Sequence, residues 1–299
     1  MDINVINRLK AIDGCTVTEN EPLAAHTTFG IGGKAAVFAE VTAAAAPAAI
    51  ALMTETATPF EVLGRGSNVL IADKTLDKVF LHFGQDMADI TVQGETLVCG
   101  AGASLSAACI KARDEGLSGM EFAYGIPASI GGAVYMNAGA YGGEIKDILL
   151  YADIVSLDGK IHRMNAEELE LSYRHSGLMY NTLFCISAVF SLKKGDKAEI
   201  DAKMQELMGR RREKQPLEYK SAGSTFKRPQ GAYAAALIEQ CGLKGYSVGG
   251  AEVSTKHSGF VINKGGASFD DVMAVIAHVQ QVVKDKTGFA LEIEPEIME

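Results

Sequence analysis

Glycine is the feature of this sequence that most restricts its fold, because it gathers in short clusters instead of spreading evenly. The clusters lie at 30–33, 64–66, 100–102 and, most densely, 125–143, in a chain with 32 glycines among 299 residues. This share of glycine is higher than the roughly 7% found in ordinary proteins. Glycine adopts backbone conformations and permits close approaches that other residues do not. The clusters therefore predict tight, specialised loops between short strands.

Hydrophobic patterns between these loops indicate both strands and helices. Two short strands run directly into a Gly-x-Gly sequence, and further apolar runs are bounded by turn signals; the expected strands are 58–63, 69–71, 95–99, 149–157, 187–191 and one near 252–262. Helices are indicated by capping residues and by apolar stripes; the expected helices are one from 42 or 46 to about 53, 104–115, 198–212, one from 231 and 269–286. This mixture predicts an α+β protein with no internal repeat.

Composition limits the class of function. The chain is 47% hydrophobic and 22% charged, which is typical of a folded globular protein, and its length predicts two or three domains. Its net charge of −9 argues against nucleic acid as a partner. The start of the chain has no signal-peptide pattern, and no apolar run has the roughly 18 residues of a membrane span. We therefore expect a cytoplasmic protein without a membrane partner.

The cysteines indicate neither a metal site nor a disulfide framework. There are five, an odd number, and none forms a C-x-x-C pair. They are expected to be small buried hydrophobic residues in a reducing compartment, and no metal is predicted.

The first candidate site is the loop Gly64-Arg65-Gly66-Ser67-Asn68, which follows a predicted strand. Glycine lets main-chain N–H groups approach a phosphate, Ser and Asn add donors, and Arg65 supplies a positive charge. Position 69 is Val and a strand follows, so the dinucleotide fingerprint of Rossmann folds is absent. A tight turn between strands explains this loop alone equally well.

The second candidate site is the stretch from Gly125 to Gly143, which is too long to be a simple connection. Small residues there would allow the main chain to surround a flat ring and a diphosphate. Two separate glycine-rich loops after strands suggest a dinucleotide that lies across a crevice. A buried glycine-rich crossover is the alternative.

Several spaced motifs together resemble the UDP-N-acetylenolpyruvoylglucosamine reductase family, in its shorter subtype that lacks a substrate-lid insertion. The motifs are Gly64–Ile71, Gly125–Gly143, Tyr173–Ser176, Ala222–Pro229 and Glu294–Ile297. The resemblance implies a two-subdomain FAD-binding fold of the vanillyl-alcohol-oxidase (PCMH) type followed by an α+β substrate-binding domain. The expected division is 1–57 and 58–197 for the FAD-binding subdomains and 198–299 for the substrate domain.

The resemblance also implies an activity in peptidoglycan precursor synthesis: reduction of the enolpyruvyl ether of a UDP-sugar to a lactyl ether, giving UDP-N-acetylmuramate. Noncovalent FAD would deliver a hydride from N5 of its reduced form, and NADPH would be the reductant. In this family Arg174 matches the arginine at the substrate carboxylate, Ser224 matches the proton donor, and Glu296 matches an acidic catalytic partner. Considered without the resemblance, they could be a surface ion pair, a turn residue and part of a solvated strand face.

The remaining site residues are expected to hold the cofactor or the substrate. Lysine and arginine side chains near Ser224, namely Lys220, Lys227 and Arg228, are expected to lower the pKa of its hydroxyl. Substrate contacts are expected from Lys214, Arg228 and His257, with no obligate protein partner. The FAD contacts are expected from Gly64, Arg65, Gly66, Ser67, Asn68, Val69, Gly125, Ile126, Pro127, Ala128, Ser129, Gly131, Gly132, Asn137 and Gly139.

Two positions depart from the family pattern, and three other functions compete. Met298 stands where the family often has Arg, and Gly30 stands where a basic residue is common. The sequence Gly245-Tyr246-Ser247-Val248-Gly249, with His257 and His278 downstream, fits a serine hydrolase, but an extended segment follows where that fold needs a helix. The same flavin fold could instead serve an alcohol or sugar oxidase, or a non-catalytic flavin carrier.

Overall fold

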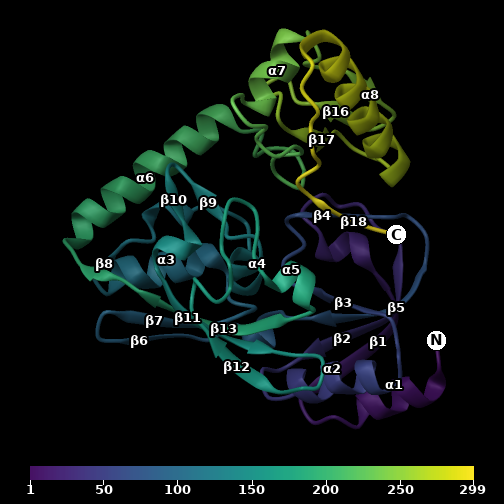
Figure 1. The fold of residues 1–299 in the computed structure, drawn as a ribbon, viewed down its shortest axis with the longest axis vertical. Coiled ribbons are helices and arrows are strands. Elements are labelled where there is room, and N and C mark those ends of the chain that lie inside the picture. The colour runs from purple at the N-terminus through teal and green to yellow at the C-terminus, as the bar shows by residue number, and fades with distance from the viewer. The chain divides into compact units, whose positions relative to one another are not determined.

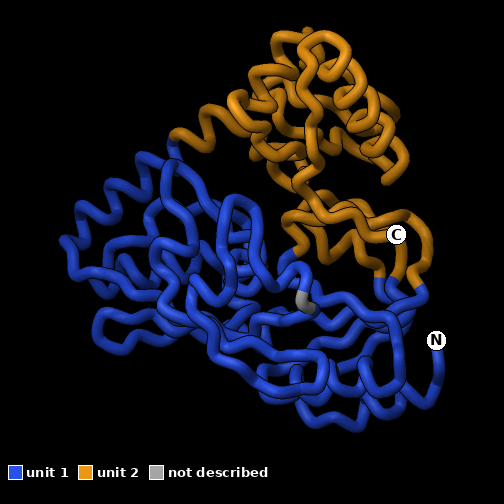
Figure 2. Tube along the Cα trace, viewed as in Figure 1, with its two compact units in different colours: residues 1–21, 35–65, 77–209 blue, residues 22–34, 66–76, 210–299 orange. Residues whose placement is uncertain are grey.

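The computed structural model describes residues 1–180 and 182–299 and divides the chain into two compact units (Figure 2). Unit 1 comprises residues 1–21, 35–65 and 77–209. Unit 2 comprises residues 22–34, 66–76 and 210–299. The chain therefore passes between the two units several times.

The N-terminal part of unit 1 is a four-stranded sheet packed with two helices. The strand order is β1-β2-β5-β3, and β3 runs parallel to β5 (Figure 1). One core cluster joins Leu9 of the first helix and Ile50 of the second to Val79 and Leu81 of the sheet, all fully buried. The elements are α1 (Ile3–Lys10), β1 (Cys15–Pro22), β2 (Lys34–Val41), α2 (Ala46–Glu55), β3 (Phe60–Leu63) and β5 (Leu76–His82).

The larger part of unit 1 is a five-stranded antiparallel sheet in the order β12-β11-β13-β7-β6. Phe190 of this sheet and Leu105 and Ile130 of two helices are fully buried in one core. Burial of each such side chain contributes about 1.5–3 kcal/mol. The elements are β6 (Ile90–Gln93), β7 (Thr96–Gly100), α3 (Leu105–Asp114), β8 (Leu117–Ser118), α4 (Ile130–Tyr135), β9 (Gly139–Ala140), β10 (Gly143–Glu144), β11 (Leu149–Val155), β12 (Ile161–Met164), α5 (Leu178–Asn181), β13 (Phe184–Ser191), β14 (Lys193–Lys194) and α6 (Lys197–Lys214).

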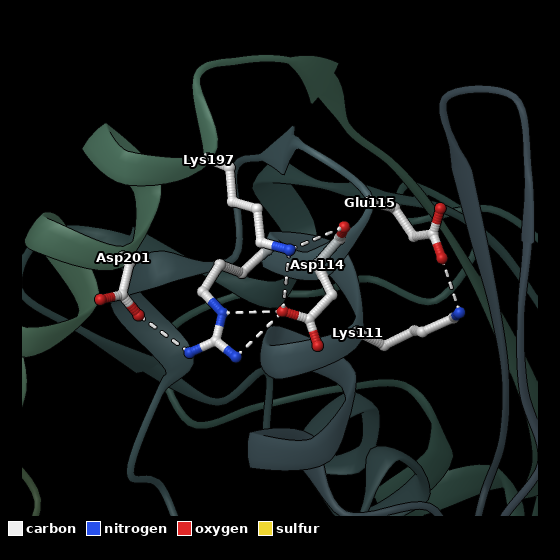
Figure 3. A network of polar contacts seen from close by, with 6 residues as sticks. Lys111, Asp114, Glu115, Lys197 and Asp201 are labelled. Carbon is white, nitrogen blue, oxygen red and sulfur yellow. Dashed lines mark hydrogen bonds and ion pairs between the residues drawn. The ribbon is translucent and has the colours of Figure 1, made fainter.

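Charged side chains join the end of α3 to the first turns of α6 (Figure 3). Arg113 pairs with Asp201 at 2.8 Å and with Asp114 at 3.0 Å, and Lys197 lies 3.5 Å from Asp114. Exposed ion pairs contribute at most about 1 kcal/mol each. This network therefore joins the start of α6 to the end of α3 but contributes little to the stability of the fold.

Unit 2 is a smaller α+β body in which α8 packs against a three-stranded sheet of order β15-β16-β17. A parallel pair, β4 with β18, joins the segment after Gly66 to the end of the chain. Phe29, Leu70 and Val275 share its buried core. The elements are β4 (Val69–Ile71), α7 (Ala234–Gln240), β15 (Ser247–Val248), β16 (Ala251–Val253), β17 (Val261–Asn263), α8 (Phe269–Thr287) and β18 (Glu296–Met298).

The compact units differ from the three-part division expected from the sequence. The boundary expected at 197/198 falls instead inside α6, between residues 209 and 210, because Ile200 and Met204 pack into the core of unit 1. Segments 22–34 and 66–76 group with unit 2, because Phe29, Ile31 and Leu70 belong to its core. The division into 1–57, 58–197 and 198–299 stays a prediction about subdomains.

Most of the expected elements are present, with one clear correction. Ser104 caps α3, and Ser268 and Asp271 form the capping box of α8, which ends at Gly288 with φ +78°. The single strand expected near 252–262 is wrong. It is a hairpin of β16 and β17, because the segment Ser254–Phe260, with Thr255 and Lys256 exposed, turns the chain back on itself.

The described part of the chain contains no helix long and apolar enough to cross a membrane, and no group of three His, Cys, Asp or Glu side chains that could hold a metal. All five cysteines are free, and four are buried. Burial raises the pKa of Cys99 to about 12, so its thiol stays protonated and unreactive.

Candidate active site

The two glycine-rich loops meet inside unit 1. A Cβ atom at Gly64 would collide with the Oγ atom of Ser129, which begins the second loop's helix. Any larger residue at 64 would thus separate the loops. Gly64, Gly125 and Gly131 are half-buried, and a glycine exposes only main-chain atoms. This arrangement of bare main chain, with exposed Arg65 beside it, suits a flat ring and a diphosphate.

The second loop is more ordered than its glycine content suggests. It contains α4, capped by the Ser129 hydroxyl, which accepts the Gly132 N–H at 3.3 Å. The N–H groups of Ile130 and Gly131 donate to the carbonyls of Ala103 and Ala101 at 2.9 and 2.8 Å. These bonds fix the loop to the segment after β7, so that its exposed main chain is held in one conformation.

Gly66 lies in unit 2 and needs to be glycine for two reasons. Its φ of +57° is unfavourable for other residues, and a Cβ atom would collide with the His26 carbonyl. Its own carbonyl accepts the Thr28 N–H at 3.1 Å. The main chain that approaches this glycine closely is that of the protein itself, at His26 and Thr27.

Arg174 stands at the tip of a two-residue turn in unit 1. Ser172 and His175 exchange two main-chain hydrogen bonds of 3.1 Å, with Tyr173 and Arg174 between them. The φ of Arg174 is +52°, which costs a residue with a Cβ atom about 1–2 kcal/mol. Its Nη2 atom donates to the Gly139 carbonyl at 3.4 Å. Strain of this kind is concentrated at functional sites.

Glu144 is an acidic neighbour of this turn that the sequence analysis did not single out. Burial raises the pKa of its carboxyl, but hydrogen bonds from Lys146 and Asn137 and the charges of Lys146 and Arg174 outweigh burial, so the pKa is lowered. The carboxylate is therefore ionised at neutral pH. The sequence signal that could have identified Glu144 is its position as an acidic residue directly after Gly142-Gly143.

Ser224 lies in unit 2 on a segment anchored on both sides. Before it, the Thr28 hydroxyl donates to the Ser221 carbonyl at 2.7 Å. After it, the Thr225 N–H donates to the Gly259 carbonyl at 2.8 Å, and the Thr225 hydroxyl accepts the Val261 N–H at 2.8 Å. Ser224 itself is half-buried, so these bonds hold a partly exposed hydroxyl.

Glu296 is joined to the same region of unit 2. Its N–H donates to the Asn68 carbonyl at 2.9 Å where β18 begins beside β4, and the Asn68 amide donates to the Glu294 carbonyl at 3.3 Å. The Glu294 N–H donates to the Thr225 carbonyl at 2.9 Å. One chain of main-chain bonds thus connects the segments of Ser224 and Glu296. Met298, the departure from the family, is buried in this strand.

The cations near Ser224 in the sequence have other partners. Lys227 forms an ion pair with Glu292, and the Arg228 guanidinium lies 4.6 Å from the centre of the Tyr233 ring. A Cβ atom at Gly30 would lie 2.9 Å from Nζ of Lys220, so this lysine occupies the space that a side chain at position 30 would need. The expectation that these three cations lower the pKa of Ser224 gains no support from these contacts.

The predicted substrate residues all lie in unit 2. Lys214 is exposed at the end of α6, and Arg228 is exposed as well. His257 lies in the turn between β16 and β17, where its Nδ1 atom accepts the Gly259 N–H at 3.2 Å. Ser247, the serine of the hydrolase pattern, lies in β15 and pairs with Glu252 of β16, so the strand-turn-helix elbow of hydrolases is absent there.

Burial lowers the pKa of His257, with the charge of Lys244 adding to the effect, and a hydrogen bond to the main chain of His257 itself and the charge of Glu239 offset it only in part. Below the usual pKa of 6.5 the unfolded chain binds a proton that the folded chain does not, so acid destabilises the fold. We expect the melting temperature of His257→Gln to fall less steeply than that of the native protein from pH 7 to pH 5. His162→Gln, at an exposed histidine, controls for imidazole removal. Parallel declines for native protein and His257→Gln would contradict the expectation.

Comparison with known proteins identifies the family. A family model described as UDP-N-acetylenolpyruvoylglucosamine reductase, C-terminal domain, matches residues 215–298, and one described as FAD binding domain matches residues 34–165. The UDP-N-acetylenolpyruvoylglucosamine reductase of Lachnoclostridium phytofermentans is 48% identical in an alignment of 287 residues, and the match covers 93% of this chain and 91% of that protein. This chain belongs to the UDP-N-acetylenolpyruvoylglucosamine reductase family.

Solved structures agree with this family. The UDP-N-acetylenolpyruvylglucosamine reductase from Thermus caldophilus matches with a TM-score of 0.81 and 34% identity over 95% of this chain and 99% of that one. A glucooligosaccharide oxidase from Acremonium strictum matches with a TM-score of 0.50 at 14% identity, over 98% of this chain and 60% of that one, and shows a shared fold alone. The resemblance, the α+β fold of vanillyl-alcohol-oxidase type and FAD as cofactor are thereby confirmed.

Proposed function

We propose that this chain reduces the enolpyruvyl ether of UDP-N-acetylglucosamine enolpyruvate to the lactyl ether of UDP-N-acetylmuramate, in peptidoglycan precursor synthesis. The observation that carries the proposal is the match to reductases of that name over more than nine-tenths of both chains. NADPH is proposed as the reductant. We also propose that the protein works in the cytoplasm, since its precursor substrate is a soluble UDP-sugar.

Residues of both glycine-rich loops are proposed to hold the FAD. Half-buried glycines at 64, 125 and 131 offer main-chain atoms to the flavin and its diphosphate, and Arg65 offers the counter-charge. The bonds from Ile130 and Gly131 to the segment after β7 keep this surface preformed. When bound, FAD supplies the hydride of the reaction.

Arg174 is proposed to bind the carboxylate of the enolpyruvyl group. A guanidinium forms two parallel hydrogen bonds with a carboxylate. Negative charge on that carboxylate grows when a hydride reaches the vinyl carbon beta to it, so a fixed cation stabilises the transition state more than the ground state. The turn of Arg174 is held at its base by two main-chain bonds, which keeps the guanidinium attached to a rigid support.

Ser224 is proposed to give the proton that completes the reduction at the alpha carbon. The enolate formed on the substrate is basic enough to take a proton from a hydroxyl. Glu296 is proposed as its acidic partner, since its strand is joined to the Ser224 segment through Thr225. Lys214, Arg228 and His257 are proposed to contact the UDP-sugar.

Flavin spectroscopy tests the proposed function. The purified protein should absorb near 450 nm, NADPH should bleach this band without oxygen, and UDP-N-acetylglucosamine enolpyruvate should restore it. Restoration by oxygen alone, with no response to the UDP-sugar, would favour an oxidase. Bleaching that neither agent reverses would favour a flavin carrier, and a protein that takes up no FAD would refute all three.

A further inference from the structure

Asn137 is a completely buried polar residue near the Arg174 turn. Its side chain is 0% exposed, and its φ of +41° is a conformation that Asn tolerates better than most residues. It lies just after α4, between the two halves of the second glycine-rich loop. The sequence suggested that it contacts the cofactor.

Every hydrogen-bonding group of this side chain is used within the protein. Its Nδ2 atom donates to Glu144 Oε2 at 3.0 Å and to the Ser172 carbonyl at 2.9 Å. Its Oδ1 atom accepts the Lys146 N–H at 2.9 Å. An amide nitrogen has two hydrogens, so neither is left to donate to a cofactor.

The Ser172 carbonyl is the base of the Arg174 turn, because it also accepts the His175 N–H at 3.1 Å. The other end of the turn is held by Ser176, a fully buried residue whose hydroxyl donates to the Tyr135 carbonyl at 2.6 Å. Both anchors therefore connect the turn to the end of α4. Between them stands Arg174, in a backbone conformation that it would not adopt on its own.

We infer that Asn137 is a positioning residue for Arg174, which it holds through the Ser172 carbonyl, and that Glu144 orients the Asn137 amide for this task. The inference rests on the proposed role of Arg174. Loss of the amide releases the turn, so the guanidinium no longer stands ready at the substrate carboxylate. The bonds lost with the amide are those to Glu144, the Ser172 carbonyl and the Lys146 N–H, so the loosening begins at this turn and its partners.

Asn137→Gly tests the inference, because glycine accepts the positive φ and only the amide is lost. We expect FAD content, flavin spectrum and flavin reduction by NADPH to be unchanged, while flavin reoxidation by the UDP-sugar slows at least 10-fold. Asn20→Gly is the matched control, since Asn20 is exposed, has a φ of +59° and lies in the same unit. It should behave as the native enzyme.

A double-mutant cycle with Arg174→Gly decides whether Asn137 acts through Arg174. In the Arg174→Gly background there is no guanidinium to position. Adding Asn137→Gly there should slow flavin reoxidation by less than a further 2-fold. An equal slowing in both backgrounds, loss of FAD, or slower reduction by NADPH would overturn the inference. If Asn137→Gly does not fold, Ser176→Ala replaces it in the same cycle, because the Ser176 hydroxyl holds the other end of the Arg174 turn. The same loss of effect in the Arg174→Gly background is then expected. A native enzyme whose flavin ignores the UDP-sugar would refute the proposed function instead.

Discussion

Ser224→Ala is expected to separate the two halves of the catalytic cycle. Reduction of the flavin by NADPH should proceed at nearly the native rate, because no proton from Ser224 is needed there. Formation of UDP-N-acetylmuramate should slow by about 10²-fold or more, as loss of a general acid does. Stopped-flow absorbance near 450 nm, with NADPH and the UDP-sugar added in separate mixing steps, measures both rates.

Ser247→Ala provides the control for this substitution. Ser247 is an exposed serine of the same unit, and it belongs to the hydrolase-like pattern that lies in a strand here. Its loss should leave both half-reactions unchanged. Equal slowing of both half-reactions in Ser224→Ala would mean that this hydroxyl is not the proton donor.

Arg174→Gly is expected to change the stability of the protein little and to make it far less active. Glycine relieves the φ of +52°, a gain of about 1 kcal/mol, which offsets the loss of guanidinium interactions such as the 3.4 Å hydrogen bond to Gly139, the contact with the Tyr173 ring and the attraction to Glu144. The melting temperature of the FAD-bound protein should stay within about 2 °C of the native value. Flavin reoxidation by the UDP-sugar should slow by about 10²–10³-fold, as when a preorganised donor to a developing oxyanion is removed.

Glu170→Gly is the matched control for the backbone effect. Glu170 is exposed, has a φ of +51° and lies on the same unit, four residues before Arg174. It should gain about 1 kcal/mol of stability with unchanged activity. If Glu170→Gly lowers the melting temperature, the strain argument is wrong; if Arg174→Gly retains activity, the proposed role of Arg174 is wrong.

Local sequence signals were sufficient for most helices and for the place of the loops. Ser104 and the Ser268–Asp271 box marked helix starts, because a capping side chain satisfies N–H groups only three residues away. The division between β16 and β17 was missed. The segment between them is mostly polar, with Thr255 and Lys256 exposed, which is typical of a turn, but the apolar residues on both sides made the whole stretch look like one strand.

The roles of individual side chains were harder to predict than the positions of helices and loops. The sequence suggested Asn137 as a cofactor contact, and the structure directs all three of its bonds into the protein. Lys220, Lys227 and Arg228 are near Ser224 in sequence, yet Lys227 pairs with Glu292, Arg228 lies over the Tyr233 ring, and Lys220 lies in the space beside Gly30. Sequence distance does not tell where a long flexible side chain ends.

The sequence by itself determined the chemistry that this chain can offer: bare main chain at two glycine-rich loops, a guanidinium, a hydroxyl and a carboxylate, in an order that matches one family. The tertiary structure alone decided that Gly64 lies against Ser129 and that Arg174 is held in a left-handed conformation. It also decided that the strand of Glu296 runs beside the strand that follows Asn68. These features depend on contacts between residues tens to hundreds of positions apart. Local propensities contain no information about such contacts, because they arise only when the cores of the two units form.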